Sequence, residues 1–373
     1  MTAQAFDVAI IGGGLVGAAI AFGLRDLGAR LALVDEGDVA YRAARGNFGL
    51  IWVQGKGAGM PAYGAWTQQS AREWPRLAAD LAQLTDIDVA LRQSGGMHVC
   101  LSAPELDARA KRLWSVVGQP GFPDCPIEVL DRAGVAARLG DVGPEVAGGT
   151  WCPLDGDCNP LRLLRALHAS LARDGVVRLA DHRATRIEPV ASGFCIATSR
   201  GTIRCERVVL AAGLGNATLA PMVGLRAPVT PNKGQIIALE RVPPFLRMPL
   251  DTIRQTDEGT VLIGDSQQDA GFDDSLSIGV LAAMARRAVR TFPFLRDVRA
   301  VRAWSALRVM SPDGFPLYAR SIAHPGAWLA TCHSGVTLAA VHATALAAAI
   351  RDDALPAACA TFDLARFDVD QAA

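Results

Sequence analysis

The sequence predicts an α/β protein in which a parallel sheet is combined with a second, α+β part built on an antiparallel sheet. Three observations carry this prediction. The chain opens with a buried strand, a glycine-rich turn and a helix. Further buried strands are predicted in its middle and near its end. The segments between them contain strand patterns of a second sheet. With 373 residues, half of them hydrophobic, the chain can form one large domain or two interlocked ones.

The composition argues against several partners and compartments. The chain has 37 basic and 37 acidic residues, so no positive excess favours a nucleic-acid partner. The eight cysteines include no CxxC pair, so we expect reduced thiols and no metal or iron–sulfur site in this chain. The apolar run over residues 8–24 is short and contains glycines, so we expect neither a signal peptide nor an integral membrane segment. We therefore predict a cytoplasmic protein whose membrane contacts, if any, are made through partners.

A glycine-rich turn follows the first predicted strand, residues 6–11. Residues 12–17 read GGGLVG and contain the pattern GxGxxG. In this pattern the first glycine permits a tight turn, the second lets the backbone approach a pyrophosphate, and the third lets helix and strand pack closely. The helix predicted over residues 15–27 offers its N-terminal amides to the phosphates. The dinucleotide contacts predicted from this turn are Gly12, Gly14, Leu15, Val16 and Gly17.

An acidic residue ends the second predicted strand, residues 30–34. Asp35 lies 18 positions beyond the last glycine of the pattern and can accept hydrogen bonds from both ribose hydroxyls. Glu36 takes this role if the register differs by one residue. An NAD enzyme usually continues with further βα units, whereas here residues 42–59 form a glycine-rich stretch typical of backbone laid against a large planar cofactor. This stretch favours FAD over NAD, and an ordinary surface loop is the alternative.

Later segments are predicted to reach the same cofactor. A meander of short strands over residues 180–210 ends in small residues, which let a strand end touch the nucleotide. A strand over residues 328–331 leads through a glycine turn into an alanine-rich helix, residues 338–350, whose N-terminus suits the pyrimidine side of a flavin. The cofactor contacts predicted outside the N-terminal turn and its acidic residues are Arg45, Gly46, Asn47, Gly49, Leu50, Ala184, Ala212, Gly213, Gly335, Val336, Thr337 and Leu338.

The nucleotide-binding segments come from the start, the middle and the end of the chain, which implies two interleaved domains. A discontinuous, Rossmann-like FAD-binding domain is predicted for residues 1–75, 150–225 and 310–373. The substrate domain then consists of residues 76–149 and 226–309, and its antiparallel sheet includes strands predicted at 235–239, 260–265 and 298–309. Helical patterns at 67–84, 104–117 and 278–289 carry no chemistry of their own.

Motifs along the whole chain resemble the FAD-dependent D-amino-acid oxidase, glycine oxidase and sarcosine oxidase family. They are IIGGGLVGAAIA with VDEG near the N-terminus, VVLAAG ending at residue 213, KGQ at 233–235, LRVMSPDGFPLY at 307–318 and ATCHSGVTLA at 330–339. More narrowly, RGNFGLIWVQGKG at 45–57 resembles the flavin-bearing β subunits of bacterial opine oxidases, D-hydroxyproline dehydrogenases and hydrogen cyanide synthases.

The resemblance implies a flavin-dependent amine dehydrogenase, in which the Cα hydrogen leaves as hydride to flavin N5 and the resulting imine is hydrolysed. It favours the catalytic β subunit of a hetero-oligomer that oxidises a secondary α-amino acid of the opine or D-hydroxyproline type. A larger flavin subunit and a small iron–sulfur subunit would be its partners and would carry any FMN or cluster. The alternatives are a self-sufficient glycine, sarcosine or D-amino-acid oxidase that produces hydrogen peroxide, and a non-catalytic subunit that only holds FAD.

The resemblance also implies roles for individual side chains. Arg308 aligns with the arginine that clamps the substrate carboxylate in glycine oxidase, and a structural ion pair is the alternative. His333 is expected to bind substrate or tune the flavin, unless it is a structural histidine. Lys56 and Lys233 are candidates to hold flavin or a second carboxylate, and Gln54 is a polar candidate near the ring.

Two positions depart from the family pattern. Ala44 stands where many relatives have a serine that bonds a phosphate, so backbone amides around residues 45–46 are expected to do more. Residues 306–308 are Ala, Leu and Arg, where covalent relatives place a cysteine shortly before the corresponding turn. The FAD is therefore expected to be non-covalent. We expect Cys332 to be a small apolar filler.

Overall fold

The computed structural model describes residues 4–37 and 43–367. The predicted N-terminal order of strand, turn, helix and strand is confirmed as β1 (Gln4–Ile11), α1 (Leu15–Leu24) and β2 (Leu31–Val34). A 3₁₀ turn, Arg25–Leu27, extends α1 to the predicted end at Gly28. Residue 42, the first of the predicted glycine-rich stretch, lies outside the described residues.

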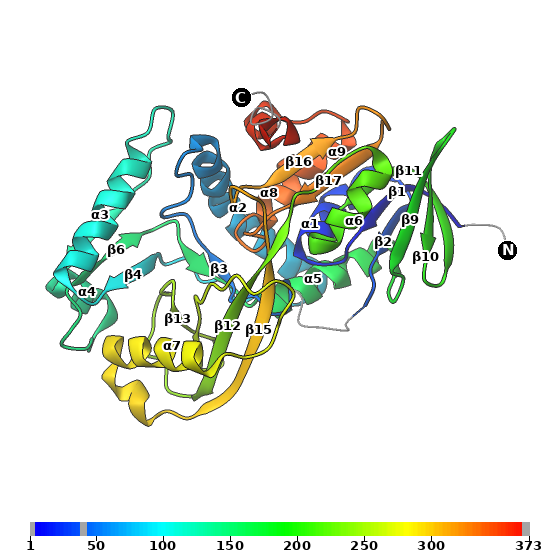
Figure 1. The fold of residues 1–373 in the computed structure, drawn as a ribbon. Coiled ribbons are helices and arrows are strands. Elements are labelled where there is room, and N and C mark those ends of the chain that lie inside the picture. The colour runs from blue at the N-terminus through cyan, green and yellow to red at the C-terminus, as the bar shows by residue number, and fades with distance from the viewer. Residues whose placement is uncertain (1–3, 38–42, 368–373) are drawn as a thin grey trace.

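The main sheet has the strand order β16-β17-β11-β1-β2-β8. Strands β17, β11, β1, β2 and β8 run parallel, and β16 joins the edge in the antiparallel direction. Segments from the start, middle and end of the chain thus lie side by side, as predicted (Figure 1). The bounds of the later strands are β8 (Val177–Leu179), β11 (Gly201–Leu210), β16 (Leu317–Arg320) and β17 (Ala327–Thr331).

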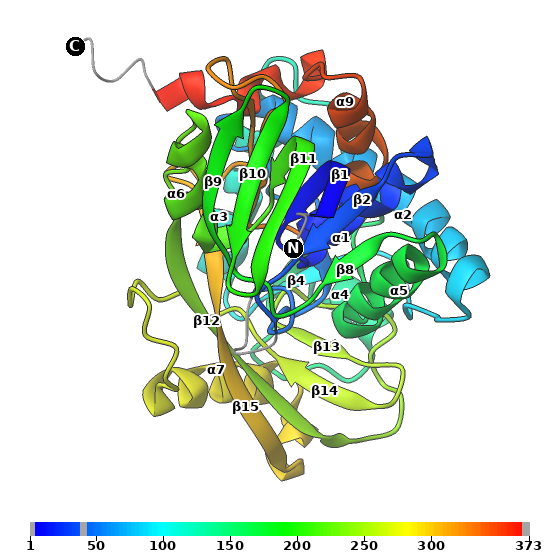
Figure 2. The same ribbon diagram turned by 90° about the vertical axis from the view of Figure 1, so that its right-hand side faces the viewer.

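Each face of this sheet packs on its own hydrophobic core. Along β1, Val8 and Ile10 face the core shared with the helices, whereas Ala9 and Ile11 face the meander, because side chains alternate along a strand. The meander, β9 (Ala184–Val190) and β10 (Gly193–Thr198) paired to β11, covers the second face together with α6 (Asn216–Leu219) (Figure 2). The helices of the first face are α1, α2 (Pro61–Thr85), α5 (Pro160–Arg173), α8 (Ala339–Val341) and α9 (Ala347–Arg351).

The second part contains the predicted antiparallel sheet, in the order β13-β14-β12-β15. Its core is shared with a three-stranded sheet, β4-β6-β5, on which α3 and α4 lie. The bounds are β12 (Thr230–Arg241), β13 (Ile253–Gln255), β14 (Thr260–Ile263), β15 (Ala300–Met310) and α7 (Ile278–Thr291), then β4 (Gly96–Cys100), β5 (Glu128–Asp131), β6 (Gly148–Cys152), α3 (Ala103–Val117) and α4 (Arg132–Leu139). A short ribbon pairs β3 (Leu50–Ile51) with β7 (Gly156–Asp157).

Two details differ from the sequence patterns. Helix α2 begins at Pro61, six residues before the expected start at 67, because its first turn contains Pro61 and Gly64, which in sequence indicate a turn or loop. The helix expected over 338–350 is interrupted by a π-helical turn, His342–Leu346, between α8 and α9. The carbonyl of Ala343 in this turn lies against Gly23 of α1, where a Cβ would overlap it, so close packing of the two helices accompanies the wider turn.

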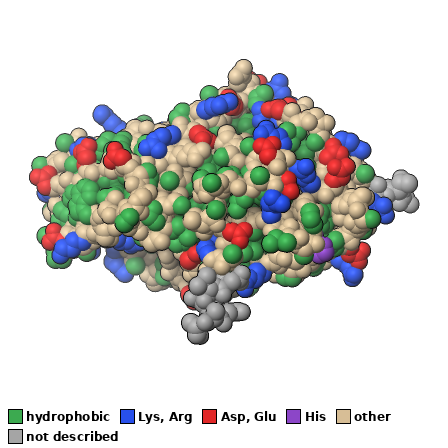
Figure 3. Space-filling model, turned by 90° about the horizontal axis from the view of Figure 1, so that it is seen from above, with side chains coloured by type: hydrophobic (Ala, Val, Ile, Leu, Met, Phe, Trp, Pro, Cys, Tyr) green, Lys and Arg blue, Asp and Glu red, His purple; other side chains and the backbone are tan. Residues whose placement is uncertain are grey.

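Surface charge is mixed, as the balanced composition predicts. On the face seen from above, Lys and Arg side chains lie among Asp and Glu and leave no large area of one sign (Figure 3). Within residues 4–37 and 43–367, no helix has both the length and the apolar character needed to cross a membrane.

Candidate cofactor cavity and substrate face

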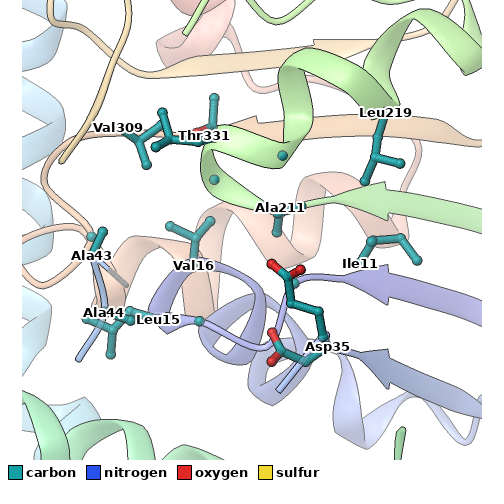
Figure 4. A pocket seen from close by; sticks show the side chains of 18 of the residues that line it. Ile11, Leu15, Val16, Asp35, Ala43, Ala44, Ala211, Leu219, Val309 and Thr331 are labelled. Carbon is teal, nitrogen blue, oxygen red and sulfur yellow. The ribbon is translucent and has the colours of Figure 1, made fainter. Parts of the chain in front are cut away.

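A cavity of about 720 Å³ lies at the carboxyl ends of the parallel strands. Its lining begins with Gly12 after β1 and Asp35 after β2, and extends to Thr331 and His333 at the end of β17. Figure 4 shows Asp35 on one side of the cavity and Val309 and Thr331 on the other. Open α/β sheets bind ligands at this edge, and pockets for small molecules and cofactors measure roughly 300–1,000 Å³. The cavity therefore suits an extended cofactor.

The glycine turn is built for close approach. Gly12 has a φ of +111°, and a Cβ there would overlap the carbonyl of Ala211 after β11. A Cβ on Gly17 would overlap the carbonyl oxygen of Gly12, so the turn and α1 are in direct contact. The N-cap residue of α1 is Gly14, which has no side chain to bond the first-turn amides. These amides are therefore left for an anionic ligand at the positive end of the helix.

Asp35 braces the same turn. Its Oδ2 accepts a hydrogen bond from Gly13 N at 2.7 Å, and its Oδ1 accepts one from Gly37 N at 2.9 Å. Both Asp35 and Glu36 line the cavity, so either carboxylate is placed to meet a ribose. The ribose contact stays a prediction for both residues.

The cavity brings together most of the predicted cofactor residues. Those that line it are Gly12, Gly14, Leu15, Val16, Asp35, Glu36, Asn47, Ala184, Ala212, Gly213 and Gly335, together with His333, which was expected to bind substrate or tune the flavin. Those that do not line it are Gly17, Arg45, Gly46, Gly49, Leu50, Val336, Thr337 and Leu338. Thr337 ties two of these segments together, since its Oγ1 accepts from Trp52 N at 3.1 Å and donates to Leu50 O at 3.3 Å.

Several lining residues were not singled out by the sequence. His182, Arg183 and Thr185 reach the cavity because His182 N donates to Asp35 O at 2.7 Å, beside the end of β2. Phe272 comes from the loop before α7 in the second part of the molecule. Neither segment carries a local motif, and both reach the cavity only through tertiary pairing.

Arg308 on β15 holds its guanidinium against the backbone of β12, where a Cβ on Gly234 would collide with it. Its Nη1 donates to Ser266 O at 2.7 Å and to Asn232 Oδ1 at 3.2 Å. Among the described residues, Nη2 and Nε have no hydrogen-bond partner, and no carboxylate lies within 4.0 Å of the guanidinium. Burial lowers the pKa of Arg308, and the nearby carboxylate of Asp265 opposes that shift. The guanidinium is therefore bound through Nη1 alone. The described residues do not provide the ion pair that a purely structural role of Arg308 would involve.

His333 and Lys56 meet at Ser334. Nδ1 of His333 lies 3.3 Å from Ser334 Oγ, and Nζ of Lys56 donates to the same oxygen at 3.1 Å. Burial, followed by the charges of Lys56 and Arg308, lowers the pKa of His333 to about 3. His333 is therefore a neutral imidazole at physiological pH.

The other two polar candidates belong to the framework. Lys233 is 2% exposed, and its Nζ forms an ion pair with Asp273 Oδ2 at 2.7 Å. Gln54 is buried, donates from Nε2 to Asp155 Oδ2 at 2.8 Å and accepts from Thr150 Oγ1 at 2.7 Å. Neither residue lines the cavity.

Three features define a dinucleotide-dependent oxidoreductase. They are a glycine turn at a helix N-terminus, a long cavity at the edge of a parallel sheet, and an arginine on an adjoining antiparallel sheet that is hydrogen-bonded through only one of its three nitrogens among the described residues. The chain belongs to the FAD-dependent oxidoreductase family described as DAO, whose sequence model matches residues 7–349. FAD is therefore the cofactor, and the fold is that of this family, as the sequence predicted.

Three similar proteins match most of the length of this chain. The chain is 43% identical to an opine oxidase subunit of Agrobacterium tumefaciens (strain Ach5) over 326 residues, which cover 87% of this chain and 88% of that protein. It is 41% identical to the corresponding opine oxidase subunit of Rhizobium meliloti over 98% of this chain and 99% of the relative. Among solved structures, glycine oxidase from Geobacillus kaustophilus matches with a TM-score of 0.88 and 26% identity, over 97% of this chain and 98% of that one.

Proposed function

We propose that the chain is the catalytic β subunit of a hetero-oligomeric, FAD-dependent dehydrogenase that oxidises a secondary α-amino acid of the opine or D-hydroxyproline type. The observation that carries the proposal is the half-bound guanidinium of Arg308 beside the cofactor cavity. Identities of 43% and 41% to proteins named as subunits of opine oxidases support the substrate class and the presence of other subunits.

The residues of the cavity fit FAD. Gly12, Gly14 and the first turn of α1 would hold the pyrophosphate, Asp35 or Glu36 the ribose, and the segment ending in Gly335 the ring. When bound, FAD supplies a hydride acceptor at N5. Burial raises the pKa of Cys332 to about 12, so its thiol is a poor nucleophile although it lines the cavity, which supports non-covalent FAD.

The substrate contacts follow from charge and geometry. Arg308 binds the α-carboxylate through Nη2 and Nε, a bidentate contact that fixes the orientation of the Cα–H bond. His333 stays neutral and presents its ring to the cavity, where it orients substrate or ring without adding charge. Water then hydrolyses the imine.

The partners and the location are part of the proposal. A larger flavin subunit and a small iron–sulfur subunit take the electrons, and the assembly works in the cytoplasm. The division into an FAD-binding domain (1–75, 150–225, 310–373) and a substrate domain is retained as a working scheme. Strand β6, Gly148–Cys152, crosses its border at 149/150.

Electron acceptor preference tests the proposal against the oxidase alternative. We expect the purified chain, loaded with FAD and given its amine, to reduce an artificial dye at least about tenfold faster than it reduces oxygen. Oxygen consumption and dye bleaching at equal substrate concentration measure the two rates. Rapid peroxide formation by the chain alone would contradict the dehydrogenase and support the self-sufficient oxidase.

A further inference from the structure

Lys56 is placed at the ring end of the cavity by a small hydrogen-bonded cluster. Its Nζ donates to Ser334 Oγ at 3.1 Å, and the hydroxyl of Tyr63 donates to the same oxygen at 2.9 Å. The two neighbours of Ser334, His333 and Gly335, both line the cofactor cavity. Nζ also lies 5.9 Å from the centroid of the Tyr63 ring. The amine is therefore held next to residues that line the cavity.

Hydrogen bonds to the buried carboxyl of Asp155 hold the turn that carries Lys56. Lys56 N donates to Val53 O at 3.0 Å, which closes the turn. The buried carboxyl of Asp155 accepts from Val53 N at 2.5 Å and from the side chain of Gln54 at 2.8 Å. These bonds fix the backbone immediately before Lys56.

No ion pair holds Lys56 in its charged form. Among the residues that the structure describes, no carboxylate lies within 4.0 Å of Nζ. The groups that act on it over longer distances are the carboxyls of Asp155 and Asp265, the guanidinium of Arg308 and the thiol of Cys332; the neutral His333 and the Tyr63 hydroxyl lie alongside. Burial, the largest effect, lowers the pKa of Lys56, and Arg308 lowers it further.

The acidic groups that would favour a charged lysine all have raised pKa values. Burial raises the pKa of Asp155 to about 7 and that of Asp265, although Asp265 is accessible to solvent, to about 6. The Cys332 thiol stays protonated, since burial raises its pKa to about 12. Burial thus favours the neutral amine at Nζ.

We propose that Lys56 is the base that takes the proton from the ammonium group of the bound substrate. This proposal rests on the proposed function, because it assigns a proton acceptor to that reaction. The N–H bond of the substrate ammonium breaks, its electron pair stays on the substrate nitrogen, and a new N–H bond forms on Nζ. No oxidant or reductant is needed for this step.

The chemistry requires such an acceptor. An amino acid in solution near pH 7 carries an ammonium group, which has no lone pair with which to form the imine as the Cα–H bond breaks. Burial lowers the pKa of Lys56 toward the operating pH, where a general base is most effective. The guanidinium of Arg308, which would hold the carboxylate, is near enough to Lys56 to lower the pKa of its amine, and both groups influence His333, which lines the cavity.

The pH dependence of substrate oxidation tests the proposal. In the FAD-loaded chain, we expect Lys56→Met to lower kcat/KM at pH 7.5 by about 100- to 10,000-fold, the usual contribution of a general base. The residual activity should rise about tenfold per pH unit up to the pKa of the substrate amine, because only the free amine then reacts. Lys56→Arg should behave in the same way, since arginine keeps a charge but does not accept the proton.

Lys111→Met is the matched control, because Lys111 is exposed on α3 and lies outside the cavity. It should keep the wild-type pH profile. FAD content, measured by absorbance, shows whether each variant still binds the cofactor. A Lys56→Arg variant with wild-type activity would show that charge alone matters and would overturn the proposal, as would an unchanged profile in Lys56→Met.

A second readout does not depend on turnover. ¹⁵N-labelled 2-aminoisobutyrate has no Cα hydrogen, so it binds as a substrate analogue without being oxidised. At pH 7.5 we expect the ¹⁵N shift of the free amine when it is bound to the wild-type holoenzyme, and that of the ammonium in Lys56→Met. An ammonium shift in both proteins would contradict the base. If no amine reduces the flavin of the wild type at any pH, the proposed function itself fails, which is a different outcome.

Discussion

Replacing Arg308 by alanine is expected to lower kcat/KM for the amino-acid substrate by about 100- to 1,000-fold, mainly through KM. The reason is the half-bound guanidinium, whose Nη2 and Nε are open to a carboxylate while Nη1 is fixed by Ser266 O and Asn232 Oδ1. Loss of one partner of a desolvated charge pair costs about 2–5 kcal/mol, and about 1.4 kcal/mol corresponds to a factor of ten. Steady-state kinetics with a dye acceptor measures the change.

Arg302→Ala serves as the control, because Arg302 is an exposed arginine on the same strand, β15. It should leave kcat/KM within about twofold. Arg308→Lys should recover only part of the loss, since an ammonium does not form the bidentate contact. Unchanged kinetics in Arg308→Ala would contradict the clamp and favour a subunit that holds FAD without binding substrate.

Replacing Gly17 by alanine is expected to remove FAD from the purified protein. The new Cβ would overlap the carbonyl oxygen of Gly12, so the glycine turn must move away from α1 and from the strand end at Ala211. Overpacking of this kind costs about 1–3 kcal/mol in stability, and the displaced turn no longer presents its amides to the pyrophosphate. The ratio of flavin to protein absorbance and the thermal unfolding midpoint measure both effects.

Gly279→Ala is the matched control. Gly279 lies in the first turn of α7, is exposed, and has no atom within 4 Å of the position of a Cβ. Alanine there should keep FAD and leave the free energy of unfolding unchanged or raise it by up to about 1 kcal/mol. Full FAD content in Gly17→Ala would mean that the turn tolerates a side chain and that the account of the pyrophosphate site is wrong.

The parts of the fold that the sequence predicts well are those with strong local signals. The order β1, glycine turn, α1 and β2 follows from a β-branched run, GGGLVG and a helix that ends at Gly28. The sheet of β12, β14 and β15 was also predicted, although β12 extends beyond the expected range 235–239, β14 ends two residues before the expected 265, and β15 is shifted from 298–309.

The three-stranded sheet β4-β6-β5 was missed because its strands are short and rich in glycine. Gly148 and Gly149 of β6 lie where a Cβ would overlap or crowd the carbonyls of Leu130 and His98, so the glycines reflect close strand packing. In sequence, the same glycines indicate a turn. Only tertiary pairing distinguishes the two possibilities.

The residues of the site also fall into those that a local motif identifies and those that only tertiary pairing brings to the cavity. The residues of the glycine turn were assigned from a motif, whereas His182 and Phe272 enter the cavity through pairing that no local pattern encodes. From the sequence alone, Lys56 and Lys233 could not be distinguished, since each stands beside a glycine. The structure distinguishes them: Lys233 forms an ion pair with Asp273, whereas Lys56 has no carboxylate partner among the described residues.

The central claim is that the chain holds FAD and uses it to oxidise an amino acid. An absorbance spectrum of the purified chain, repeated without oxygen after adding opines, D-hydroxyproline, glycine or sarcosine, tests this claim most directly. We predict a yellow protein whose flavin band is bleached by an opine or by D-hydroxyproline. A protein that stays colourless after FAD is added would contradict the cofactor site, and a yellow protein that none of these amines bleaches would contradict the proposed substrate class.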